Sequence, residues 1–139
     1  MSITTRIICP PTASVGEEVT IQVEVENNDP DPIRVTRVYP YGLETFTLSL
    51  TASADVDDPD AAAAWELKDH YGTDVYFPKS HLIAEPGEQF TLTFTAVPTV
   101  PNDDAYDEYD ILAIAWATNT TTKKKLTLQG AYGEIKVTD

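Results

Sequence analysis

Hydrophobic and polar residues alternate along two stretches of the chain, residues 19–25 and residues 90–96, and each stretch follows a Gly-Glu pair. The apolar members are Val19, Ile21, Val23 and Val25 in the first stretch and Phe90, Leu92, Phe94 and Ala96 in the second. Successive side chains of a strand point to opposite faces, so each stretch predicts a strand with one buried and one wet face. The pattern predicts two sheets packed face to face, with one of these apolar rows laid against the other.

Shorter alternating stretches predict further strands. Residues 3–9 form an expected edge strand, and Pro10 and Pro11 then break it or move the chain to the other sheet. Residues 33–39 form another, but their alternation slips between Val35 and Val38, which indicates a β-bulge or the end of the strand.

Residues 52–85 are the least regular part and predict an insertion into the sandwich. Apolar and polar residues alternate from Trp65 to Phe77 around a turn, which favours a hairpin. A helix over residues 59–69 is the alternative, because Asp58 and Pro59 suit a helix start and Gly72 suits the position after its end.

Residues 111–117 are apolar at both alternating positions, which is typical of a central strand covered on both sides. Leu112, Ile114 and Trp116 are the bulkier set, so we expect them to face the opposing sheet. The other face then needs a cover from residues 52–85 or from another subunit.

Length and composition predict one domain over residues 1–139, large enough for a core without a metal or a disulfide. Cys9 is the single cysteine, so no internal disulfide can form. No stretch has the apolar length of a membrane span, and the N-terminus lacks a secretory signal.

The charge balance is strongly acidic, with 9 basic and 23 acidic residues and a net charge of −14. Such a surface repels phosphate backbones and anionic lipids, so we expect neither nucleic acid nor membrane as a partner. The composition resembles that of proteins from salt-loving organisms, and an ordinary acidic surface explains it equally well.

The turns and strands together resemble a known architecture. Gly16 and Glu17 open an alternating strand that ends at Asn27, Gly87 and Glu88 open a second, and an acidic crossover leads to a final hairpin. This arrangement resembles immunoglobulin-like sandwich modules, in particular CARDB-like domains and the Ig-like domains of tailed-virus capsids and tails. The resemblance implies an all-β, antiparallel two-sheet immunoglobulin-like sandwich. Tyr109 also resembles the tyrosine corner of such folds, which would instead place Ile111 inside.

Catalytic motifs are missing from the sequence, so we expect that the protein is not an enzyme. His70 and His81 have neither a metal-ligand spacing nor a nucleophile motif. Calcium is the cofactor alternative, because oxygen-rich loops at one end of a sandwich can supply ligands to a hard cation. The candidate ligands are Asp55, Asp57, Asp58, Asp60, Asp103, Asp104 and Asp107, with Asp29 and Asp31 as a further acidic pair.

Two features are candidates for contact with a partner. Lys123, Lys124 and Lys125 form the one basic cluster, at an expected hairpin tip, where they could dock on an acidic loop or protect a sheet edge. Trp65 is the other candidate. It belongs to a set of aromatic residues that could stack on a carbohydrate if they shared one face: Tyr39, Tyr41, Trp65, Tyr71 and Tyr76.

These observations favour a non-enzymatic structural protein that binds other protein subunits, as a homo-oligomer or in a capsid lattice. The sharper prediction is a virion component of a tailed virus, such as a capsid decoration or turret protein, assembled in the host cytoplasm. The alternative is a calcium- or carbohydrate-binding module of a surface protein, at the cell surface if a signal peptide has been replaced at Met1.

Overall fold

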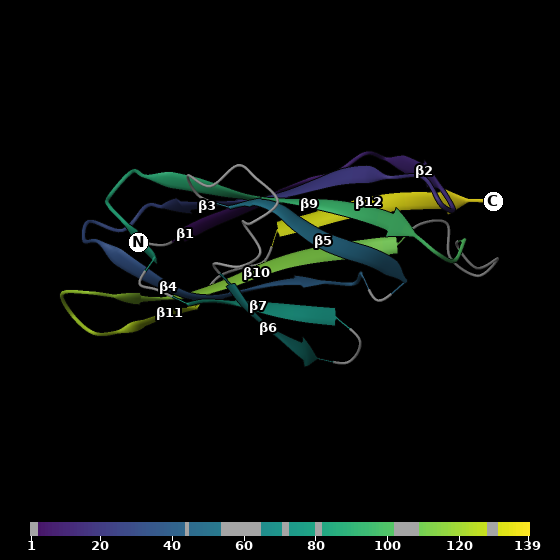
Figure 1. Ribbon diagram of the computed structural model, residues 1–139. Helices are drawn as coiled ribbons and strands as arrows, with labels where there is room; N and C mark the ends of the chain where they lie inside the picture. Colours follow the sequence, from purple (N-terminus) through teal and green to yellow (C-terminus); the bar gives the residue numbers. More distant parts are fainter. Residues whose placement is uncertain are drawn as a thin grey trace.

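Two β-sheets lie face to face in the computed structural model of the chain (Figure 1). The structure describes residues 3–43, 45–53, 65–70, 73–79, 82–101, 109–127 and 131–139. Within these ranges the regular elements are all strands. The predicted immunoglobulin-like β-sandwich is therefore confirmed as the fold class.

The smaller sheet has four antiparallel strands. Their order across the sheet is β1 (Ile3–Ile8), β3 (Val19–Asn27), β9 (Gln89–Pro98) and β5 (Phe46–Ser53). Gly16 and Gly87, in the turns before β3 and β9, have φ values of 85° and 81°, which a residue without a Cβ adopts at little cost. The two Gly-Glu pairs therefore act as predicted, as turns that start the two central strands.

The larger sheet has eight strands within the described residues. Its main path runs β2 (Thr12–Ser14), β12 (Ala131–Thr138), β10 (Tyr109–Asn119), β4 (Ile33–Tyr41), β7 (Thr73–Pro78) and β6 (Trp65–His70). Two short strands, β11 (Lys125–Thr127) and β8 (Leu82–Ala84), pair with β10 and β4 respectively. Every pair is antiparallel except β2 with β12.

Pro10 and Pro11 separate β1 in the smaller sheet from β2 in the larger one, so the predicted switch between sheets is confirmed. The predicted hairpin in the insertion is also present, as β6 and β7. The alternative helix over residues 59–69 is wrong from Trp65 onwards, and its remaining part, 59–64, lies outside the described residues.

The apolar rows of β3 and β9 are neighbours in one sheet, which corrects the expectation that they face one another from opposite sheets. Ile21 pairs with Phe94, and Val23 pairs with Leu92. Directly paired residues of antiparallel strands point to the same face, so both rows turn inward together. They pack against the inner face of the larger sheet, which includes Val38 and Ile135.

The inward face of β10 is the less bulky one, so the expectation that Leu112, Ile114 and Trp116 face the opposing sheet is wrong. The buried residues of this strand are Ile111, Ala113, Ala115 and Ala117. The same core holds large rings, among them Tyr76 and Phe94 with centroids 5.1 Å apart. Small side chains on β10 leave volume for such rings, because core packing matches large residues with small ones.

Candidate functional site

The outer face of the larger sheet carries three apolar cross-strand pairs on β10 and β4. Leu112 pairs with Tyr41, Ile114 pairs with Tyr39, and Trp116 pairs with Arg37, whose long aliphatic stem serves as the apolar part. Cross-strand neighbours on one face stabilise a sheet by direct side-chain contact. Here the contacts form on the side that faces away from the other sheet.

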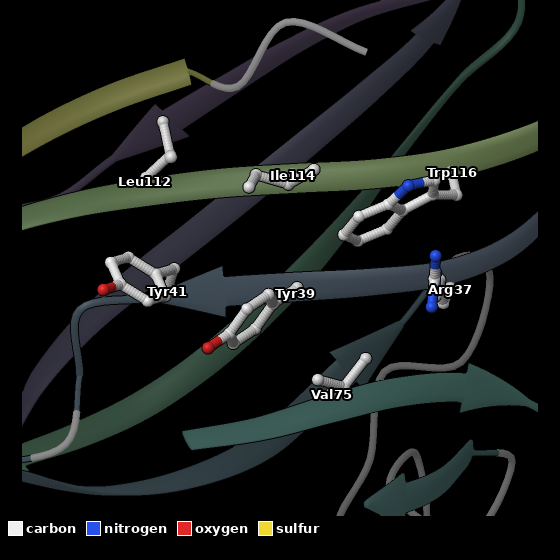
Figure 2. Close-up of a pocket in the computed structure, with 7 residues that line it drawn as sticks. All are labelled: Arg37, Tyr39, Tyr41, Val75, Leu112, Ile114 and Trp116. Carbon is white, nitrogen blue, oxygen red and sulfur yellow. The ribbon is translucent and has the colours of Figure 1, made fainter. Parts of the chain in front are cut away.

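These side chains line an open pocket of about 480 Å³ (Figure 2). Val75 of β7 borders the pocket on the side of β4 that lies away from β10. We call the lining residues the outer patch: Arg37, Tyr39, Tyr41, Val75, Leu112, Ile114 and Trp116. Among these described residues Arg37 supplies the one charge, and the others are apolar or aromatic.

The outer patch is accessible at its surface although its floor is packed. Tyr39 is buried under its neighbours, with its ring 5.4 Å from that of Tyr41 in an edge-to-face arrangement. Tyr41 remains 46% exposed, and Leu112, Ile114 and Trp116 are partly exposed. Contiguous apolar surface of this kind marks interaction sites on soluble proteins.

A β-bulge in β4 directs Arg37 and the two tyrosines outward. The pairing with β10 shifts register between Trp116 and Ala117, where Thr36 is the additional residue, and its hydroxyl donates to the Trp116 carbonyl oxygen at 3.1 Å. Ile33 and Val35 point inward before the bulge, and Val38 points inward after it. The irregularity predicted between Val35 and Val38 is therefore confirmed.

A second pocket, of about 590 Å³, continues the outer patch beyond Arg37 and Trp116. Arg34 and Lys125 line it together with Arg37, and no acidic residue of the described part of the chain is among its lining residues. Arg34 and Lys125 each pair with Thr118 from opposite sides of β10. We call Arg34 and Lys125 the basic end of this face.

Two acidic residues lie side by side at the opposite end of the same face, and Lys136 lies two residues beyond one of them on β12. Asp110 at the start of β10 pairs with Glu134 of β12, and both carboxylates are exposed. We call these two residues the acidic end. Tyr132, which is 62% exposed and pairs with Leu112, lies between the acidic end and the outer patch.

A hydrogen bond links Tyr132 to the acidic end. Its phenol donates to the Asp110 carboxylate, which is the main reason why the pKa of Tyr132 is raised, and the negative charges of Asp110 and Glu134 add to the effect. A phenolate beside two carboxylates is disfavoured. The ring therefore stays neutral, with its hydroxyl held at the rim of the apolar surface.

A separate polar cluster joins two loops at one end of the sandwich. The Asn119 side-chain amide donates to Asp29 at 2.5 Å and to Asp31 at 3.0 Å, and its carbonyl oxygen accepts the backbone N–H groups of Thr121 and Thr122. Asn119 and Asp29 are only 5% and 7% exposed. We call this arrangement the Asn119 clasp, and its hydrogen bonds hold the loop before β4 against the β10–β11 hairpin.

The predicted interaction residues, which the structure describes, are not gathered in one place. Trp65 is 4% exposed and belongs to the core, so its ring offers no surface to a partner, and Tyr76 is also in the core. Lys123, Lys124 and Lys125 are exposed at the β10–β11 hairpin, as expected, and Lys125 also lines the second pocket.

The candidate calcium ligands lie outside the described residues, which include none of Asp55, Asp57, Asp58, Asp60, Asp103, Asp104 and Asp107. Tyr71 and His81 also lie outside them, and His70 is described by its backbone alone, as the last residue of β6. Within the described part of the chain, no cluster of His, Cys, Asp and Glu side chains could hold a metal ion.

No protein-family model and no curated protein sequence matches the chain. Solved structures do match. BcpA, the major pilin subunit of Bacillus cereus, superposes with a TM-score of 0.64 at 9% identity over 98% of this chain and 40% of the pilin. The major pilin SpaD of Corynebacterium diphtheriae gives 0.65 at 11% identity over 96% of this chain and 33% of the pilin.

A CARDB domain from Pyrococcus furiosus, crystallised with di-metal ions, gives a TM-score of 0.54 at 16% identity, over 98% of this chain and 87% of the domain. The chain thus spans less than half the length of each pilin. At these identities the likeness shows a shared fold, the Ig-like sandwich, and the expected resemblance to CARDB-like modules is confirmed at that level. No helix in the described ranges could cross a membrane.

Proposed function

We propose that this chain is a non-catalytic structural module that binds other protein subunits through its outer patch. The observation that carries the proposal is the row of cross-strand pairs Leu112–Tyr41, Ile114–Tyr39 and Trp116–Arg37 on the face turned away from the core. Aromatic residues and arginine are enriched at protein interfaces because they combine apolar area with a polar group. The pilin and CARDB neighbours, which share the fold, agree with such a role.

The matched test compares two single substitutions to aspartate. Ile114→Asp places a charge at the centre of the outer patch, and Ser49→Asp places the same charge at an exposed position of β5, in the other sheet. Each tagged chain is used as bait for proteins from its own source, with copies of the chain counted among the retained proteins. We expect retention by the unchanged chain and by Ser49→Asp, and loss with Ile114→Asp.

Equal retention by all three baits, or by none, would contradict the proposal.

We also propose that residues 1–139 act as one domain, because β2 and β12, from the two ends of the chain, pair in one sheet. Within this class, a virion subunit such as a capsid decoration or turret protein, assembled in the host cytoplasm, stays a prediction, and so does a halophilic host. The cell-surface location and the calcium-binding loops stay predictions as well.

Carbohydrate binding is the second candidate, and a specific observation favours it. Tyr41 and Tyr132 both pair with Leu112, from opposite sides of β10, and both rings are exposed. Exposed aromatic rings that flank an apolar side chain on a flat sheet could stack on a sugar. Binding on a glycan array that disappears with Tyr41→Ala and with Tyr132→Ala would support this candidate, and no binding by the unchanged chain would contradict it.

A further inference from the structure

We propose that the partner of the outer patch is a second copy of this chain, packed face to face with its β10 strand antiparallel to the first. The inference rests on the proposed function and names its partner. Its basis is the distribution of charge over the outer face. The outward positions of β10 run from Asp110 through Ile114 to Thr118, and the two charged ends lie at the limits of this row.

The outer face is complementary to itself. Its acidic end is the pair Asp110 and Glu134, its basic end is the pair Arg34 and Lys125, and Ile114 lies midway between them along β10. A two-fold axis that lies in the interface, parallel to the two sheets and perpendicular to β10 at Ile114, therefore places the acidic end of each copy over the basic end of the other. Self-complementarity of this kind is the requirement for an isologous dimer.

The opposite alignment is disfavoured by the same charges. Two copies with parallel β10 strands would place carboxylates over carboxylates and cations over cations, and like charges at an interface oppose binding. The net charge of −14 also opposes random association of copies. The antiparallel arrangement brings together the surfaces of opposite charge around an apolar centre.

The size of the face fits a weak dimer. The eight residue steps from Asp110 to Thr118 span about 26 Å, and four strands from β12 to β7 span about 19 Å in width. Each copy would therefore cover roughly 500 Å², or roughly 1,000 Å² in total, close to the lower limit for a specific interface. We expect a dimer that forms and dissociates with concentration.

Sedimentation equilibrium of the purified chain from about 10 µM to 1 mM tests the dimer. We expect a monomer–dimer equilibrium, and we expect Ile114→Asp to raise the dissociation constant by about 10-fold or more, as for a central interface residue. Ser49→Asp, with the same change in charge, should leave the constant within about 2-fold. A monomer at all concentrations, or equal constants for the three chains, would overturn the inference.

A charge exchange tests the antiparallel arrangement. One variant carries Arg34→Glu with Lys125→Glu, and the other carries Asp110→Lys with Glu134→Lys; all four positions are exposed. Each variant alone should be monomeric, because both of its ends then have the same sign, whereas an equimolar mixture should form the dimer again. Self-association by either variant, or a monomeric mixture, would overturn the arrangement.

Glu18→Lys with Glu26→Lys is the control for the variant with Asp110→Lys and Glu134→Lys, since it makes the same change in net charge on β3 and just before it. This control should dimerise as the unchanged chain does. A monomeric purified chain that still retains another protein through Ile114 would remove the inference and leave the proposed function in place. A purified chain that neither dimerises nor retains another protein through Ile114 would contradict the proposed function as well.

Discussion

The guanidinium carbon of Arg37 lies 4.0 Å from the centre of the Trp116 ring, across the pair of strands β4 and β10. This contact depends on the bulge at Thr36. Without the additional residue, strict alternation from Ile33 and Val35 would point Arg37 into the core and Val38 outward. The bulge thus turns an arginine toward the outer surface, where it stacks on an aromatic face and separates the two pockets.

Arg37→Ala should expose more of the Trp116 ring and destabilise the fold by about 0.5–1 kcal/mol, the usual range for an exposed cation–π contact. Acrylamide quenching of tryptophan fluorescence and urea unfolding measure the two effects. Arg34→Ala removes an equal charge from the same face, at the position that pairs with Thr118. If both substitutions raise quenching equally, the stacking of Arg37 on Trp116 does not shield the indole.

The two tryptophans should differ sharply in their effect on stability. Trp65→Ala leaves a cavity in the core and should destabilise the fold by about 3–5 kcal/mol, whereas Trp116→Ala removes a partly exposed ring and should cost about 1 kcal/mol. Urea unfolding of the two variants provides the comparison. Similar losses would mean that Trp65 is not a core residue.

The Asn119 clasp should contribute strongly to stability. Asn119→Ala deprives the buried Asp29 carboxylate of its donor and leaves two backbone N–H groups without their acceptor, so we expect a loss of about 2–4 kcal/mol. Thermal unfolding measures it. The control is Asn28→Ala, at an exposed position that bonds Thr4, which should cost under about 1 kcal/mol. A loss no greater for Asn119 than for Asn28 would contradict the clasp.

Two glycines with positive φ provide a matched pair. A Cβ at Gly42, where φ is 96°, would lie 2.3 Å from the Asp110 carbonyl oxygen, whereas a Cβ at Gly16, where φ is 85°, meets nothing within 4 Å. Both alanine substitutions strain the backbone by about 1–2 kcal/mol. Gly42→Ala must also displace the start of β10, so its midpoint in urea should fall well below that of Gly16→Ala. Equal midpoints would show that the start of β10 can be displaced without loss of stability.

Cys9 should react slowly with thiol reagents. Burial raises the pKa of its thiol, and a hydrogen bond to the backbone of Glu134 lowers it by a smaller amount. The folded state therefore disfavours the thiolate. The stability that the neutral Cys9 thiol contributes to the fold is fully present below the pKa of the unfolded thiol, and it is lost as the pH rises through the pKa of the folded thiol. Iodoacetamide alkylation followed against pH should show a higher midpoint in the folded chain than in urea. A lower midpoint would contradict this assignment.

Much of the candidate site was within reach of the sequence, although its role was not. The apolar character of residues 111–117 at both alternating positions already indicated that β10 has a second apolar face. The slip between Val35 and Val38 indicated the bulge that sends Tyr39 and Tyr41 to that face. Trp65 was a candidate for contact with a partner as one of a set of aromatic residues, yet the hairpin of β6 and β7 places it in the core.

Local chemistry determined the strands, the glycine turns, the switch after Pro10 and the sandwich class, because each depends on residues close together in the chain. The assignment of strands to sheets was decided only in the tertiary structure, where β3 and β9 became neighbours. The tertiary structure also decided which face of β10 points into the core. Both of its faces are apolar, so alternation alone cannot orient the strand, and the volume left by the rings of the core selects Ala113 and Ala115 for the inside.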